Sequence, residues 1–300
     1  MRQRRVVVCG ATGQQGGAVL RHALQREGWE VVALSREPEG EKARRWSKEG
    51  AQVVRADLED RDSLIRAFQG ADYVFGLTQP WSPDYRKCHP EREVEQGRNI
   101  TEACRETGVK LLVMSSAAHL AEGKTGIPHV DSKLEVEAYV SQSGVPFTFI
   151  RPVQFMDNLG SPFFPIRRGS IRGFVDGKVR VPYVAVDDIG AFAALIFDGP
   201  EGFIGQGLDL VGDFISGEEL CLLLSRLRGG ERFRYRSVPR WLMKLWAKEF
   251  YAMRLAFEEF GKPPYREDIW EIIAACRKFH PGLMSMEAFL LAQGFDTRPL

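Results

Sequence analysis

The chain opens with the apolar run Arg5-Val-Val-Val-Cys9, which leads directly into Gly10-Ala-Thr-Gly-Gln-Gln-Gly-Gly17 and then into an amphipathic stretch from Ala18 to Gln25. A short uninterrupted apolar run is typical of a buried strand, and the glycines that follow it indicate a tight turn. The order strand, glycine-rich turn, helix N-terminus is the arrangement that cradles a dinucleotide. We therefore predict nucleotide binding here, the alternative being a glycine turn that only closes a loop.

Each glycine of this loop has its own expected task. Gly10 permits the sharp turn off the strand, Gly13 lets the backbone approach a pyrophosphate, and Gly16 lets the helix pack closely on the sheet. The helix N-terminus then offers unpaired N–H groups and the positive end of its dipole to phosphates. The loop residues expected at the cofactor are Gly10, Thr12, Gly13, Gln14, Gln15 and Gly16.

Strand-like and helix-like segments alternate over the first half of the chain. Apolar strand patterns at 30–35, 52–56, 70–78, 109–115 and 146–150 are separated by helical patterns. Such alternation predicts right-handed βαβ units and an α/β, doubly wound parallel-sheet Rossmann fold. We predict a nucleotide-binding core over 1–152 and a smaller mixed, mainly helical C-terminal lobe over 153–300. Within that lobe, 178–212 is expected to contribute elements back to the core.

Composition excludes several classes of protein. The 300 residues include 41 Lys and Arg against 40 Asp and Glu, so the net charge of +1 gives no argument for nucleic acid or an anionic membrane as a partner. Five scattered cysteines form no C-x-x-C pair, which predicts neither a disulfide framework nor a metal site. No apolar segment approaches the ~20 residues of a membrane helix and no signal peptide pattern is present, so we expect a cytoplasmic protein.

The end of the second expected strand bears on which nucleotide is bound. NAD-preferring folds place an acidic residue there, against the ribose hydroxyls, whereas this chain has Ser35-Arg36. The planar fork of Arg36 can bind a 2′-phosphate, which favours NADP(H); the alternative is a solvated charge at a strand end. Asp57-Leu58 follows the third expected strand and fits the adenine edge, the alternative for Asp57 being a helix N-cap.

The region of the fifth strand and the next helix suggests a reductase with an incomplete catalytic set. Catalytic short-chain reductases carry a Ser at the strand end and a Tyr and Lys four residues apart on one helix face. This chain has Ser115, then His129 and Lys133, so His129 takes the place of the tyrosine. Either His129 is the acid, since imidazole titrates near neutrality, or the acid is absent and Lys133 only binds the cofactor ribose.

Successive blocks of the chain resemble the NmrA-like family, a group of atypical short-chain dehydrogenases/reductases. The blocks are the glycine loop, Arg36, Gly70-Ala-Asp72, His129 to Tyr139, Arg151 to Asn158 and Val186 to Gly190. The resemblance implies that Thr78 and Gln79 pass near the pyrophosphate and nicotinamide ribose. It also implies that Pro152, Val153 and Phe155 wall the nicotinamide.

The resemblance leaves two functions open. One is an NADPH-dependent oxidoreductase of a small flat acceptor such as a quinone, with Lys133 and His129 as catalytic residues. The other is a non-catalytic NADP(H) redox sensor that acts through a regulatory protein partner, in which the loop from Gln79 to Pro90 orders on binding. Neither needs direct contact with nucleic acid or membrane, and a monomer and a homodimer both remain open.

Overall fold

The computed structural model describes residues 3–82, 87–118, 123–162, 164–246, 248–260 and 265–298. The chain forms two compact units. The first contains Met1–Lys124, Pro128–Pro152 and Ile189–Asp209, and the second contains Thr125–Ile127, Val153–Asp188 and Leu210–Leu300.

A seven-stranded sheet forms the centre of the first unit, in the order β11-β6-β5-β4-β1-β2-β3. Its strands are β1 (Arg4–Val8), β2 (Trp29–Ser35), β3 (Gln52–Arg55), β4 (Tyr73–Gly76), β5 (Leu111–Ser115), β6 (Phe147–Pro152) and β11 (Gln206–Leu210). All pairings from β3 to β6 are parallel. The chain builds outward from β1 to β3 and then returns to β4 on the other side of β1. A ligand is expected at this switch point, beyond the carboxyl ends of β1 and β4.

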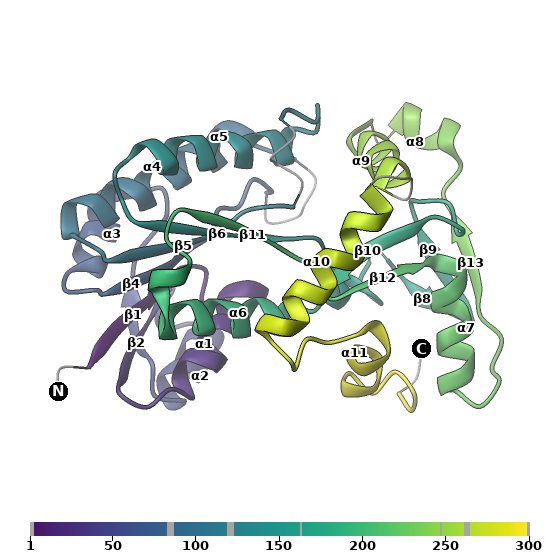
Figure 1. Cartoon of the computed structure of the whole chain (residues 1–300), viewed down its shortest axis with the longest axis horizontal. Coiled ribbons are helices and arrows are strands. Elements are labelled where there is room, and N and C mark those ends of the chain that lie inside the picture. Colours follow the sequence, from purple (N-terminus) through teal and green to yellow (C-terminus); the bar gives the residue numbers. More distant parts are fainter. Residues whose placement is uncertain are drawn as a thin grey trace. The chain divides into compact units, whose positions relative to one another are not determined.

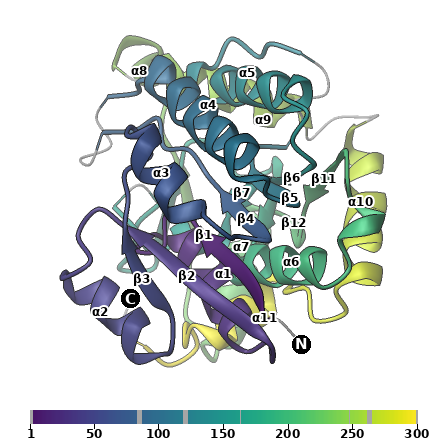
Figure 2. The same ribbon diagram turned by 90° about the vertical axis from the view of Figure 1, so that its left-hand side faces the viewer.

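Helices cover both faces of this sheet (Figures 1 and 2). They are α1 (Gln14–Leu24), α2 (Glu41–Lys48), α3 (Arg61–Phe68), α4 (Pro90–Thr107), α5 (Pro128–Gln142) and α6 (Val186–Asp198), followed by the short η3 (Pro200–Gly202). Helices α3, α4 and α5 lie on one face, and α1, α2 and α6 lie on the other. The doubly wound α/β fold predicted from the sequence is confirmed.

Burial on both faces explains why the strands are continuous apolar runs. Val6, Val7 and Val8 of β1 are fully buried, as is the run from Leu111 to Met114 in β5. Helices α1 and α6 approach closely at Gly190. A Cβ added at Gly190 would lie only 2.5 Å from the Ala18 carbonyl oxygen.

Two small sheets and most of the C-terminal helices form the second unit. The sheets have the orders β12-β10-β7 and β13-β9-β8. Their strands are β7 (Gln154–Phe155), β8 (Ile166–Arg167), β9 (Ser170–Gly173), β10 (Arg180–Val184), β12 (Asp213–Ser216) and β13 (Arg234–Ser237). The helices are η2 (Met156–Asn158), α7 (Gly217–Leu227), α8 (Arg240–Trp246), α9 (Lys248–Phe260), α10 (Tyr265–Phe279) and α11 (Met286–Ala292).

The start of α7 shows how local sequence sets these elements. Ser216 accepts a hydrogen bond from the backbone N–H of Glu219, and the Glu219 carboxylate accepts one from the Ser216 backbone N–H. This reciprocal capping box satisfies two N–H groups at the helix start. None of the helices in the described ranges is both long enough and apolar enough to cross a membrane.

Candidate functional site

The glycine loop has the geometry that close approach of a phosphate requires. Gly10 lies in the left-handed region at φ +62°, and Gly13 donates its N–H to the Gly10 carbonyl at 2.9 Å. A Cβ at Gly16 would lie 2.6 Å from the Cys9 carbonyl oxygen and closer still to that of Gly10. Only glycine therefore fits at Gly16, and α1 begins directly above the end of β1.

The N-terminus of α1 is open to an anion. Gly13 is its N-cap and offers no side-chain cap, and the first turn carries no acidic residue. Thr12, Gly13 and Gln14 are exposed. Unsatisfied N–H groups at such a helix start favour a phosphate.

Behind the loop, Trp46 of α2 holds its backbone in place. The Trp46 side chain is buried, and its indole N–H donates to the Ala11 carbonyl at 2.8 Å. Trp46 was not predicted from the sequence, where it is one apolar residue on a highly charged helix.

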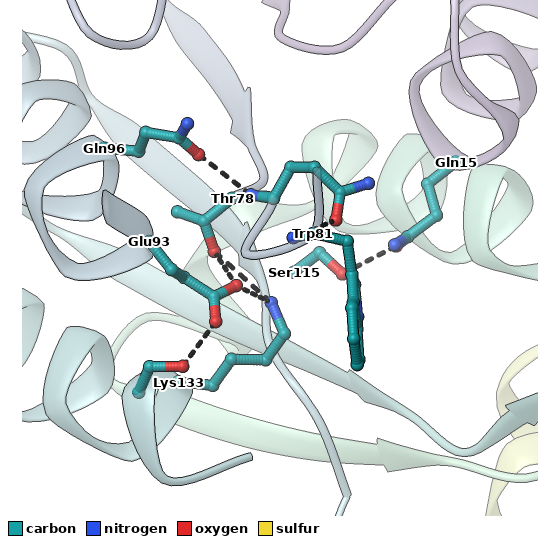
Figure 3. A network of polar contacts seen from close by, with 9 residues as sticks. Gln15, Thr78, Trp81, Glu93, Gln96, Ser115 and Lys133 are labelled. Carbon is teal, nitrogen blue, oxygen red and sulfur yellow. Dashed lines mark hydrogen bonds and ion pairs between the residues drawn. The ribbon is translucent and has the colours of Figure 1, made fainter. Parts of the chain in front are cut away.

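Lys133 of α5 belongs to a buried polar network with residues from the segment after β4 and from the first turn of α4 (Figure 3). Its ammonium donates to Glu93 Oε1 at 2.7 Å and to Thr78 Oγ1 at 3.3 Å. The Glu93 carboxylate also accepts from Thr78 Oγ1 at 2.7 Å and from Ser132 Oγ at 2.5 Å. Glu93 is fully buried, whereas the Lys133 side chain retains 17% exposure. A buried carboxylate thus fixes the cation, which still reaches solvent.

Glu93 and Gln96 are residues that the sequence analysis missed. Gln96 is buried and accepts a hydrogen bond from the backbone N–H of Gln79 at 2.9 Å. Both lie on one face of α4, and in the sequence they are two polar residues on a helix rich in Glu and Arg. The signal that could have found them is their i, i+3 spacing on the face that also carries the buried Gly97 and Ile100.

A side-chain hydrogen bond from Ser115 connects the end of β5 to the glycine loop. Its hydroxyl is buried and donates to Gln15 Oε1 at 2.6 Å. The next residue, Ser116, is also buried, and its hydroxyl has no hydrogen-bond partner in the part of the chain that the structure describes. A bound polar group can satisfy such a hydroxyl.

His129 lies in the first turn of α5, four residues before Lys133 and therefore on the same side of the helix. Its ring centroid is 5.3 Å from that of Trp81, at an interplanar angle of 48°. Trp81 belongs to the segment after β4, where the Gln79 side chain accepts its backbone N–H at 3.2 Å. Within the loop from Gln79 to Pro90, residues 83–86 lie outside the described residues.

Arg36 and Asp57 follow neighbouring strands. Arg36 is exposed beyond β2, and its side chain makes no hydrogen bond or ion pair with any residue that the structure describes. Asp57 accepts the Glu59 backbone N–H at 3.1 Å. The N-cap of α3 is Asp60, which accepts from Ser63, so the alternative interpretation of Asp57 as a helix cap is wrong. Leu58 is half-buried beside it.

The three residues expected to wall a nicotinamide divide between the two units. Pro152 ends β6 in the first unit, and its carbonyl accepts the Ala118 N–H at 3.2 Å. In the second unit, Val153 donates its N–H to the Leu210 carbonyl and Phe155 pairs with Val184 across β7 and β10. Their predicted role at the nicotinamide stays a prediction.

The first-unit residues form one candidate dinucleotide site. The glycine loop follows β1, Thr78 follows β4, and Ser115 and Ser116 follow β5, so all converge at the carboxyl edge of the sheet. The glycine loop and the start of α1 are complementary to a phosphate. The unpartnered Ser116 hydroxyl and the Lys133 ammonium are complementary to the hydroxyl groups of the same ligand. No group of three or more His, Cys, Asp or Glu among the described residues is placed to hold a metal ion.

The amino-acid sequence matches one protein family over most of its length. The sequence profile of the NmrA-like family matches residues 2–290. The chain belongs to the NmrA-like family. Among curated relatives, the NmrA-like family domain-containing oxidoreductase FrzB of Cladobotryum sp. is 30% identical over 259 residues, covering 79% of this chain and 77% of its own.

Two solved structures share the fold. NmrA, a negative transcriptional regulator solved in complex with NADP, superposes with a TM-score of 0.75 at 21% identity, covering 96% of this chain and 94% of that one. The NADPH-dependent quinone oxidoreductase QOR2 of Escherichia coli, complexed with NADPH, has a TM-score of 0.75 at 21% identity, covering 97% and 100%.

Proposed function

We propose that this NmrA-like protein binds NADP(H) and uses it as an oxidoreductase of a small flat acceptor such as a quinone. The observation that carries the proposal is the placement of the Glu93-fixed Lys133 ammonium at the same sheet edge as the glycine loop. The family's curated oxidoreductases support the oxidoreductase activity, and the complexes of structural neighbours with NAD, NADP or NADPH support a nicotinamide dinucleotide as the cofactor.

Each part of the site has a task toward that cofactor. The glycine loop and the start of α1 bind the pyrophosphate, Arg36 binds the 2′-phosphate, and Asp57 and Leu58 meet the adenine. Gln15, Thr78, Gln79, Ser115 and Lys133 lie toward the nicotinamide ribose. When bound, the reduced cofactor supplies a hydride. A quinone that accepts this hydride also takes up one proton to become the hydroquinone.

The chain's own residues then orient the cofactor and supply the proton. Glu93 and Thr78 take two of the three N–H bonds of Lys133, which leaves one N–H to hold a ribose hydroxyl or an acceptor oxygen. His129 lies on the same side of α5 and can pass a proton from solvent. A quinone needs less acid catalysis than a ketone, so the missing tyrosine is compatible with turnover.

The chemical step is tested by the loss of NADPH absorbance with a panel of quinones. We expect Lys133→Met to lower kcat/KM by about 100-fold, because the fixed cation is lost, while Lys48→Met on the exposed face of α2 leaves it unchanged. Equal rates in the two variants would exclude Lys133 from the chemistry. Tight NADPH binding without turnover on any acceptor would favour the redox sensor.

Nucleotide choice is tested at Arg36. We expect Arg36→Asp to lower the ratio of NADPH to NADH affinity by about 30-fold, since a charge-assisted bond to the 2′-phosphate is replaced by repulsion. Lys42→Asp changes the charge equally on exposed α2 and is the matched control. An Arg36→Asp ratio equal to that of the control would show that Arg36 does not read the 2′-phosphate.

A further inference from the structure

Six arginines gather on one small sheet of the second unit. They belong to β8, β9, β13 and the adjoining turns, and all six are exposed: Arg167, Arg168, Arg172, Arg232, Arg234 and Arg236. We refer to these six as the arginine face. In the sequence, they occur in two stretches about sixty residues apart, so no single basic stripe is visible there.

Strand register places four of them on the same side of the sheet. Arg172 pairs directly with Arg236 across β9 and β13. Ser170 pairs with Arg234 on one side and with Arg167 on the other. Side chains alternate along a strand, and directly paired residues share a side. The four strand arginines therefore lie on one side of the sheet, with Arg172 and Arg236 as direct neighbours and with Arg234 and Arg167 on either side of Ser170.

The opposite side of this sheet is buried. Ile166 and Ile171 pack there with Leu220 and Leu224 of α7, and Tyr235 packs against the same cluster. Figure 1 shows α7 beside β8, β9 and β13. Burial of these apolar side chains determines which residues of each strand face inward. The strand arginines therefore face outward.

The six cations have no counterion among the residues that the structure describes. None of their side chains makes a hydrogen bond, ion pair or ring contact with the residues in the described ranges. Two acids of the second unit pair with other arginines, since Glu231 pairs with Arg228 and Glu219 pairs with Arg180. Like charges at neighbouring sheet positions repel, and no ion pair within the described ranges offsets this repulsion.

Backbone strain at the hairpin tip is a second, independent observation. Arg168 is the one non-glycine residue with positive φ in the described part of the chain, at +49°. It forms with Gly169 the two-residue connection between β8 and β9, where both residues have positive φ. Gly or Asn is preferred at such positions, because a Cβ in the left-handed region is strained. An arginine kept in a conformation it disfavours points to a function for its charge.

We propose that the arginine face docks an acidic, extended segment of a protein partner. Guanidinium forks match carboxylates in geometry and bind them in pairs, and the spacing of alternate residues on an extended peptide equals that along β9 and β13. Strand β13 pairs only with β9 among the described strands, so its other edge can accept a further strand.

Nucleic acid is the less favoured polyanion. Charge over the whole chain is balanced at +1, and β8, β9 and β13 expose no aromatic side chain on which a base could stack. Arginines on an edge strand can also serve only to prevent edge-to-edge pairing; that role predicts no affinity for an acidic peptide.

Fluorescence anisotropy tests the proposal with a labelled peptide of alternating glutamate and threonine, added to the full chain. We expect salt-sensitive binding that weakens by about tenfold in the double variant Arg172→Gln/Arg236→Gln. The matched control is Arg55→Gln/Arg66→Gln, which removes two exposed arginines of the first unit. Equal affinity in both double variants, or no binding by the parent chain, would overturn the proposal.

Two further measurements make this test more specific. Arg168→Asn should raise Tm and weaken peptide binding at once, because it relieves strain and removes a charge; unchanged Tm and affinity would contradict the reasoning. A DNA duplex that binds more tightly than the peptide, with the same dependence on Arg172 and Arg236, would overturn the assignment to a protein partner. None of these measurements involves NADP(H) binding, so their outcome is independent of the proposed oxidoreductase function.

Discussion

Gly16→Ala is expected to destabilise the protein by about 3 kcal/mol and to lower NADPH affinity by roughly 100-fold. The added Cβ would lie 2.6 Å from the Cys9 carbonyl oxygen and closer still to that of Gly10. Both obstacles are backbone atoms of the strand end and turn, so no side chain can rotate away. Either α1 lifts from the sheet or the loop shifts, and both change the phosphate cradle.

Gly17→Ala is the matched control, one residue further along the same helix. A Cβ there would make ordinary contacts, 3.4 Å from the Trp46 ring and 3.6 Å from the Ala11 carbonyl oxygen. Alanine also favours a helix over glycine, so we expect unchanged or slightly higher stability. Urea unfolding and NADPH titration of both variants measure the two effects. Equal behaviour of the two variants would contradict the tight α1–β1 packing.

Glu93→Gln is expected to lower the free energy of unfolding by about 2–3 kcal/mol and NADPH affinity by about tenfold. The amide keeps the shape of the side chain but removes the charge that the Lys133 ammonium faces. Ser132 and Thr78 also donate to this carboxylate, and an amide accepts through only one of its two terminal atoms. The ammonium then loses its fixed direction.

Glu95→Gln is the control for Glu93, since Glu95 is exposed on the same helix. If Glu93 acts through Lys133, the double variant Glu93→Gln/Lys133→Met should bind NADPH no more weakly than Lys133→Met alone. Additive losses would show instead that Glu93 affects binding by another route. Thermal unfolding of the four variants separates loss of binding from loss of fold.

Sequence reasoning predicted the doubly wound sheet and the glycine loop because both depend on local patterns. A buried parallel strand is a continuous apolar run, and a glycine turn between strand and helix has few other uses. Ser115 and Lys133 could be proposed from the sequence because their positions are tied to one strand end and one helix face.

The partners of these residues could not be predicted in the same way. Glu93 meets Lys133 across forty residues of sequence, through the packing of α4 against α5. The only local signal for a buried Glu93 is its place on the face of α4 that also carries Gly97 and Ile100, and this signal does not show that its partner is Lys133. The arginine face was missed for the same reason, because strands β9 and β13 bring together residues that are far apart in the chain.

We propose that the glycine loop and Lys133 belong to one NADP(H) site. The most direct measurement is a calorimetric titration of the parent chain with NADPH and, separately, with NADH. We expect one NADPH per chain at micromolar affinity and weaker binding of NADH. Absence of heat with both nucleotides, on a chain shown to be folded by circular dichroism, would contradict the account.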